Sequence, residues 1–185
     1  SQFGANVVLV GKDYSKLEYT FKKLSKGDHL MFSQDLTEYA KLEELIIMTI
    51  EKIGKISGFV HSAGIEMTLP LRNLKPHHFE EAMSINAISA FELGRIISKK
   101  KYVSEKGASF IFIASVMGKL GQVGKVGYCS SKGAMISGAM AMALELASKK
   151  IRVNCILPGL VETEMSNSKP KLIYVNLPFL KEQNT

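Results

Sequence analysis

Two side chains in the second half of the chain could together transfer a proton to a bound molecule. Tyr128 and Lys132 are four residues apart in a segment of helical periodicity, so both lie on one face of the expected helix. An ammonium group beside a phenol stabilises the phenolate and lowers the pKa of the phenol. Ser115 follows an apolar segment that ends at Ile113, which puts its hydroxyl within reach of the same pocket. Alone, the Tyr–Lys pair is also typical of an exposed helix, so the surrounding elements decide its meaning.

The elements that must position these side chains follow from the apolar pattern. Short β-branched segments alternate with longer segments of helical periodicity. We expect strands at 6–10, 29–33, 58–61, 109–113 and 151–156, and helices at 14–24, 36–53, 76–85, 87–101 and 127–149. Strands that are apolar on both faces and alternate with helices predict a parallel sheet covered on both sides. The predicted fold class is therefore α/β, a single domain with a doubly wound, Rossmann-type parallel sheet that binds ligands at the carboxyl ends of its strands.

The composition is typical of a globular protein and excludes several other classes. Of 185 residues, 46% are hydrophobic and 22% are charged, which excludes a disordered chain, a collagen-like repeat and a coiled coil. We expect no membrane association, because no apolar segment is long enough to span a bilayer and no signal-peptide pattern is present. The net charge of +7 is scattered. It favours a solvated surface over an acidic protein partner and predicts no nucleic-acid binding.

The cysteines and histidines point to neither a disulfide framework nor a metal site. Cys129 and Cys155 are too few for a framework, which predicts reduced thiols and a cytoplasmic protein. The 4 His residues and these cysteines lack ligand spacing, so we expect no metal.

Several motifs, in the right order, make the sequence resemble the short-chain dehydrogenase/reductase family. The likeness covers about residues 1–165 and is strongest to the 3-oxoacyl-(acyl carrier protein) reductases of fatty acid biosynthesis; residues 166–185 depart from it and are expected to form a tail. The matching segments are Asp35-Leu36-Thr37, His61-Ser62-Ala63-Gly64, Ser84-Ile85-Asn86-Ala87, the set Ser115, Tyr128 and Lys132, and 152–159 followed by Val161 and Thr163.

The resemblance implies reduction of a carbonyl, in a 3-oxoacyl thioester or similar ketone, free or bound to an acyl carrier. Tyr128 would be the general acid, Lys132 would lower its pKa and bind the ribose, and Ser115 would polarise the carbonyl. Asn86 would position a water, although it could equally satisfy backbone groups of a kinked helix. The implied cofactor contacts are Lys12, Asp35, Leu36, Ser62, Ala63, Gly64, Tyr128, Lys132, Pro158, Gly159, Val161 and Thr163.

The residues after the first strand favour NADPH over NADH. An NAD site usually carries an acidic residue at the end of this strand, for the ribose hydroxyls. This chain has Gly11 there, followed by Lys12, which suits a 2′-phosphate. Lys12 could instead be a solvent-facing loop residue, and Asp13 beside it weakens the positive site.

Two departures from the family carry further expectations. His61 replaces the family's Asn and could be a core residue that satisfies the backbone, which we favour, or part of a pH-sensitive cofactor contact. The sequence also lacks a segment resembling the family's first strand and Gly-rich phosphate loop. We therefore expect strands 7–10 and 59–61 to lie one strand's width apart without direct hydrogen bonds. The alternative function is a non-catalytic member or fragment that binds no cofactor.

The segment 134–147 predicts self-association. It is apolar nearly all round, and a helix without a polar face must be buried on more than one side. We expect a homodimer or homotetramer; the alternative is a partner element within the chain.

Overall fold

The computed structural model describes residues 1–159, and the predicted strands and helices all form. The strands are β1 (Val8–Gly11), β2 (Leu30–Ser33), β3 (Gly58–His61), β4 (Ala108–Ile113) and β5 (Ile151–Ile156). The helices are α1 (Tyr14–Phe21), α2 (Tyr39–Ile53), α3 (Pro76–Met83), α4 (Ser89–Ile97) and α5 (Val126–Leu146). Every strand pair is parallel, which confirms the α/β fold class.

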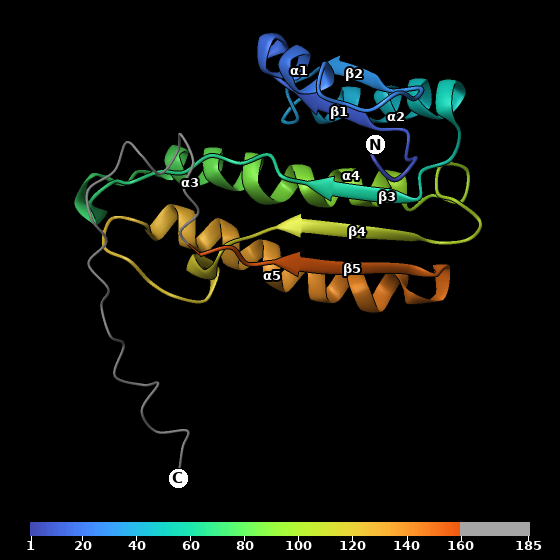
Figure 1. Cartoon of the computed structure of the whole chain (residues 1–185). Coiled ribbons are helices and arrows are strands. Elements are labelled where there is room, and N and C mark those ends of the chain that lie inside the picture. The colour runs from blue at the N-terminus through green and yellow to red at the C-terminus, as the bar shows by residue number, and fades with distance from the viewer. Residues whose placement is uncertain (160–185) are drawn as a thin grey trace.

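The strands form two separate sheets. One sheet has the order β1-β2 and the other β3-β4-β5 (Figure 1). Within residues 1–159, no backbone pairing joins β1 to β3, as expected for these two strands. In each sheet, the strands that pair are connected by a helical crossover, which is the arrangement of parallel α/β proteins.

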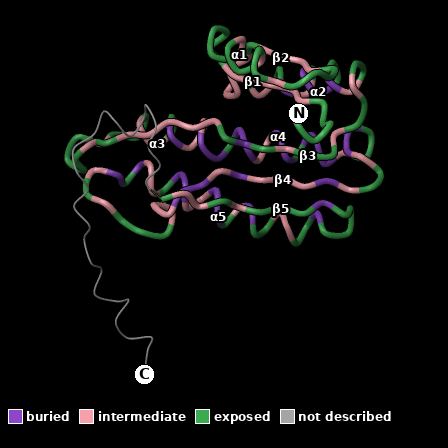
Figure 2. The backbone as a smooth tube through the Cα atoms, in the orientation of Figure 1, coloured by how far each residue is buried: buried purple, intermediate pink, exposed green. Residues whose placement is uncertain are grey.

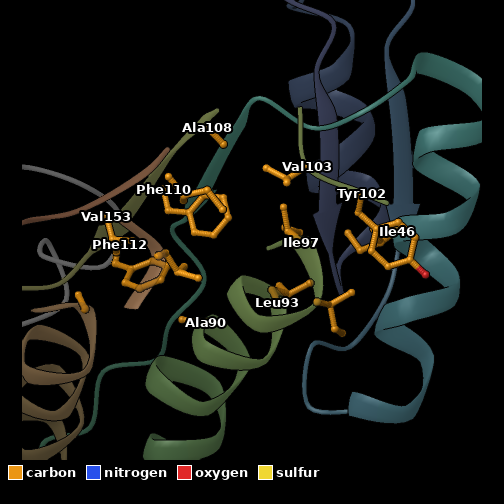
Figure 3. Packing of buried hydrophobic residues seen from close by; sticks show 14 of the residues in the cluster. Ile46, Ala90, Leu93, Ile97, Tyr102, Val103, Ala108, Phe110, Phe112 and Val153 are labelled. Atoms are coloured by element: carbon orange, nitrogen blue, oxygen red, sulfur yellow. The ribbon is translucent and has the colours of Figure 1, made fainter. Parts of the chain in front are cut away.

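Helix packing, rather than strand pairing, joins the two sheets. Apolar side chains of α2, including Leu42 and Ile46, belong to the same buried cluster as Leu93 of α4 and Phe110 of β4. Figure 3 shows Ile46 beside Tyr102, with Leu93 and Ile97 continuing the cluster toward the aromatic rings of β4. The buried positions follow α4, α5 and the strands in front of them (Figure 2). This single core holds the strand ends of both sheets in a fixed relation.

The opposite face of β3-β4-β5 is more open in this part of the chain. Phe110 and Phe112 point toward the helices and are fully buried. Val60 of β3 and Ile156 of β5 are 59% and 50% exposed. The burial of β4 therefore alternates with the period of two that is expected for a strand covered mainly on one side.

Several helix boundaries differ from the predictions. Helix α2 begins at Tyr39 rather than at residue 36, because the Asp35 side chain accepts a hydrogen bond from the Thr37 amide and holds a turn there. The two helices expected at 76–101 form one continuous helical segment, in which Ser84–Ile88 make a π-helical turn between α3 and α4. Helix α4 ends at Ile97, so the lysines at 99–101 lie beyond it.

Candidate active site

The carboxyl ends of the five strands bring the predicted site residues to one edge of the molecule. Parallel strands end on the same side of a sheet, and ligands of open α/β folds bind there. Figure 1 shows all five arrowheads pointing toward the same end. The residues that follow β1 to β5, in chain order, are Lys12, Asp35, Gly64, Ser115 and Pro158.

Helix α5 presents Tyr128 and Lys132 to this edge. The Lys132 Nζ lies 5.9 Å from the centre of the Tyr128 ring and donates a hydrogen bond of 2.8 Å to the Ile113 carbonyl. A short turn at 116–118, after β4, packs against the same helix. A Cβ atom at Gly118 would lie 2.8 Å from the Lys132 carbonyl carbon, so only glycine lets this turn approach α5 so closely. Ser115 is thereby brought to Tyr128.

Burial decides the acid–base character of this pair. Desolvation raises the pKa of Tyr128, and a side-chain hydrogen bond with Ser115 opposes that rise. Desolvation also lowers the pKa of Lys132, whose side chain is buried against Ile113. The pKa of the phenol is therefore raised, and not lowered as expected from the nearby Lys132, because burial of the phenol dominates. The phenol stays protonated at neutral pH, which is the state a proton donor needs.

Asn86 is fully buried in the π-helical turn and hydrogen-bonds to Ile65 and Ser131. Its Oδ1 accepts from the Ile65 amide at 2.7 Å, and its Nδ2 donates to the Ile65 carbonyl at 3.0 Å. Nδ2 also donates to Ser131 Oγ at 2.9 Å. Asn86 therefore joins the segment after β3 to helix α5 one residue before Lys132. These contacts satisfy backbone groups beside the π turn, and the role of Asn86 in positioning a water stays a prediction.

At the ends of β1 and β2, Lys12 and Asp35 form an ion pair. Their Nζ and Oδ2 atoms are 3.0 Å apart, and the Lys12 side chain is largely exposed. Hydrogen bonds from the backbone and hydroxyl of Thr37, followed by that from Lys12, lower the pKa of Asp35 to about 2. Asp13, which was expected to weaken the positive site, accepts a bond from the Lys16 amide and caps α1. Lys12 thus remains a cation near the strand ends, with Asp35 as its partner.

The remaining predicted cofactor contacts lie at the same edge wherever the structure describes them. A Cβ atom at Gly64 would lie 3.1 Å from Asn86 Oδ1 and 3.5 Å from Lys132 Nζ, so glycine lets these two side chains approach the backbone. Val161 and Thr163 lie outside the described residues. Of the other contacts, Leu36 packs against the core and Ala63 is half-buried, whereas Ser62 and Gly159 are exposed. The Pro158 carbonyl accepts a hydrogen bond from the Val116 amide.

Sequence reasoning missed a buried ion pair beside Tyr128. Lys125, at the start of α5, contacts Glu66 and the Thr68 hydroxyl in the segment after β3. Its Nζ lies 6.0 Å from the centre of the Tyr128 ring, on the helix turn before the phenol. The spacing of three residues between Lys125 and Tyr128 was a signal that both share a face. The partner Glu66 could not be found by spacing, because the contact spans two distant segments.

The described residues contain neither a metal-binding cluster nor a membrane-spanning helix. In the part covered by the structure, no three His, Cys, Asp or Glu side chains are grouped in a way that could hold a metal ion. None of the helices within residues 1–159 combines the length and the apolar character needed to cross a bilayer.

Comparison with known proteins shows which sequences this chain resembles. The profile of the family described as short chain dehydrogenase matches residues 1–172. An uncharacterised oxidoreductase of Mycobacterium bovis is 29% identical over 172 residues, covering 92% of this chain and 69% of that protein. The 3-oxoacyl-[acyl-carrier-protein] reductase of Homo sapiens is 29% identical over 153 residues, covering 82% of this chain and 64% of that protein. The corresponding reductase of Thermotoga maritima is 27% identical, and the match spans 55% of its length.

Solved structures show the same arrangement of strands and helices. A 7α-hydroxysteroid dehydrogenase, in complex with NADH and 7-oxo glycochenodeoxycholic acid, matches with a TM-score of 0.83 at 26% identity. That match covers 89% of this chain and 65% of the other. A short-chain dehydrogenase/reductase of Brucella melitensis matches with a TM-score of 0.81 at 28% identity, covering 89% and 66% of the two chains.

Proposed function

Because the chain belongs to the short-chain dehydrogenase family, we propose that it reduces the carbonyl group of a small-molecule or acyl-carrier-bound ketone to an alcohol. The observation that carries this proposal is the grouping of a half-buried, protonated Tyr128 with Ser115 and Lys132 at the carboxyl ends of the strands. A neutral phenol held beside a hydroxyl is suited to give a proton to an oxygen that gains negative charge.

The proton steps use atoms of this chain. Tyr128 Oη donates its proton to the carbonyl oxygen of the substrate as that oxygen becomes an alkoxide. Ser115 Oγ accepts a hydrogen bond of 3.2 Å from the Met117 amide, which fixes the oxygen and leaves the hydroxyl proton to donate. Lys132 remains a buried cation whose ammonium group is held in place by its hydrogen bond to the Ile113 carbonyl. Asn86 holds the segment after β3 against α5 through Ile65 and Ser131.

The residues present fit a nicotinamide nucleotide, which when bound supplies the hydride. Gly64 leaves the backbone open beside Lys132, and Lys12 and Asp35 provide a cation and a carboxylate at the neighbouring strand ends. The contacts carried over from the family, Val161 and Thr163 included, are part of this proposal. We favour NADPH over NADH because Lys12 follows Gly11, where an acidic residue would suit the ribose hydroxyls of NAD. To bind the 2′-phosphate, the Lys12 ammonium must leave its ion pair with Asp35.

The substrate class is proposed from similarity alone. The human and Thermotoga maritima proteins of 29% and 27% identity are 3-oxoacyl-[acyl-carrier-protein] reductases, so a 3-oxoacyl thioester is the first substrate to test, with a role in fatty acid synthesis. The chain spans about two thirds of the length of such relatives. The free thiols of Cys129 and Cys155 support a reducing compartment such as the cytoplasm.

The outer face of α5 supports self-association. Leu144 is 83% exposed and Met140, one turn before it, is 60% exposed. Beside them runs a groove between α4 and α5, whose lining includes Phe91 and Met142. Adjacent exposed apolar groups of this kind mark contact surfaces. We propose that a second copy of this chain covers them, in a homodimer or homotetramer.

The test of the proposed function is Tyr128→Phe, which removes the transferable proton and almost no volume. With NADPH and a small 3-oxoacyl thioester, kcat should fall by roughly a hundredfold or more, the usual effect of a lost general acid. NADPH binding, followed by the fluorescence of the nucleotide, should persist. Tyr19→Phe is the matched control, because Tyr19 is an exposed tyrosine of α1 away from the strand ends.

A Tyr128→Phe variant with nearly wild-type kcat would contradict this mechanism. Failure of the wild-type protein to bind either NADPH or NADH would favour the alternative, a family member without catalytic activity.

A further inference from the structure

His61 lies between the core and the candidate active site. It is the last residue of β3, it is 2% exposed, and the segment containing Gly64 follows it directly. Its ring meets those of Phe59 and Phe112 edge-on, with centroids 6.3 and 6.5 Å away. An imidazole enclosed by aromatic rings is held in one orientation, so its polar atoms have fixed targets.

The hydrogen bonds around His61 determine which ring nitrogen carries the proton. The His61 Nε2 and Ser89 Oγ atoms are 2.9 Å apart. Ser89 Oγ also lies 2.7 Å from the Ile85 carbonyl, which can only accept, so the single hydroxyl proton of Ser89 points to Ile85. The contact with His61 then requires Nε2 to donate. His61 is therefore the Nε2–H tautomer, and its buried Nδ1 has no hydrogen-bond partner among the described residues.

The same contacts tie β3 to the π-helical turn Ser84–Ile88. Ser89 follows this turn, and its amide donates to the Ser84 carbonyl five residues earlier, which is the bond that defines a π turn. The Ser89 side chain caps the carbonyl of Ile85, the residue before Asn86. His61 thus holds, through one hydroxyl, the backbone that sets the position of Asn86.

Asn86 has little freedom to move without losing its own bonds. Its side-chain amide makes two hydrogen bonds to the backbone of Ile65 and one to the Ser131 hydroxyl, with lengths between 2.7 and 3.0 Å. A small rotation of the π turn would lengthen all of them. The position of the segment after β3, beside Lys132, therefore depends on the turn remaining in register.

We propose that His61 is a positioning residue, which through Ser89 fixes the π turn and so holds Asn86 against Ile65 and Ser131. This role rests on the proposed function insofar as Asn86 supports the catalytic edge. The contacts themselves are independent of any substrate. The neutral ring suits the role, because burial and the charge of Lys132 lower the pKa of His61 to about 4.

The first experiment reads the tautomer in the wild-type protein. In ¹⁵N NMR of the imidazole at pH 7, Nε2 of His61 should show a protonated shift and Nδ1 an unprotonated one. A ring protonated on Nδ1 alone could not donate to Ser89 and would overturn the proposal.

The second experiment measures amide hydrogen exchange at Ile65, whose N–H is bound by Asn86. His61→Leu removes the donor, and Ser89→Ala removes its acceptor without touching His61. Both should speed exchange at Ile65 by roughly tenfold, the effect of weakening one buried hydrogen bond, with exchange at Phe110 unchanged as a control for the core. His61→Gln, whose side-chain amide can still donate, should restore protection. Unchanged exchange at Ile65 in Ser89→Ala would refute the role of His61.

The two proposals can fail separately. If the wild-type protein reduces no ketone, the proposed function fails, yet exchange at Ile65 still decides the role of His61. If Ser89→Ala leaves Ile65 protected while Tyr128→Phe abolishes reduction, the function stands and the positioning role is refuted.

Discussion

Acid should destabilise this protein through His61 more than through an ordinary histidine. In the fold, burial and then the charge of Lys132 lower the pKa of His61 to about 4 from an ordinary value of 6.5. The unfolded chain therefore binds a proton more readily than the native chain as the pH falls below 6.5. The contribution of neutral His61 to stability is present above pH 6.5 and is lost as the pH decreases toward 4.

The size of this loss follows from the two pKa values. The gap between 6.5 and about 4 corresponds to about 3 kcal/mol in the free energy of unfolding, most of it lost between pH 6.5 and 4. This loss is a large share of the free energy of unfolding of a folded domain, which is typically about 5–15 kcal/mol. The cause is physical: a charged imidazole would lose its water among aromatic rings and would lie within reach of the Lys132 ammonium.

The assay compares wild type with His61→Gln by urea unfolding, followed by circular dichroism, at pH 7.5, 6, 5 and 4. The variant has no titrating group at this position, so the difference between the two curves isolates His61. Asp35, whose pKa is held near 2 by Thr37 and Lys12, titrates in both proteins and cancels. We expect the difference in unfolding free energy to shift by about 3 kcal/mol against the wild type between pH 7.5 and 4. Parallel curves over this range would refute the reasoning.

Three further outcomes test the site and the surface. Replacing Gly11 with Asp and Lys12 with Ala should lower the preference for NADPH over NADH by roughly ten- to hundredfold in kcat/KM, the worth of one charged contact, and an unchanged ratio would show that Lys12 does not bind the 2′-phosphate. Gly64→Ala should shift Asn86 or Lys132 and lower kcat by roughly tenfold. Gly58→Ala, at the start of β3, where a Cβ meets no atom within 4 Å, should leave kcat nearly unchanged. Leu144→Lys should reduce the oligomer mass measured by light scattering without lowering Tm, and a wild-type mass would exclude this face as the contact.

The features that depend on neighbouring residues could be predicted from the sequence. Tyr128 and Lys132 share a helix face because 3.6 residues make a turn, whatever the rest of the chain does. Ser115 follows a β-branched segment, and parallel strands end at one edge, so its neighbourhood to Tyr128 followed from pattern and topology. These features depend on covalent geometry and on the alternation of apolar residues, which can both be read along a single chain. The lack of pairing between β1 and β3 was expected only through the resemblance to the family.

Tertiary structure decided everything that depends on burial or on contacts between distant segments. Burial raises the pKa of Tyr128 although a lysine is four residues away, because the phenolate would lose its water, and burial also lowers the pKa of that lysine. Lys12 pairs with Asp35 across the ends of β1 and β2, and the same Asp35 delays the start of α2. His61 looked like a single substitution in a motif. Its partner Ser89 lies 28 positions away in the sequence, beyond a π turn that no local periodicity signals, so only the folded chain brings the two together.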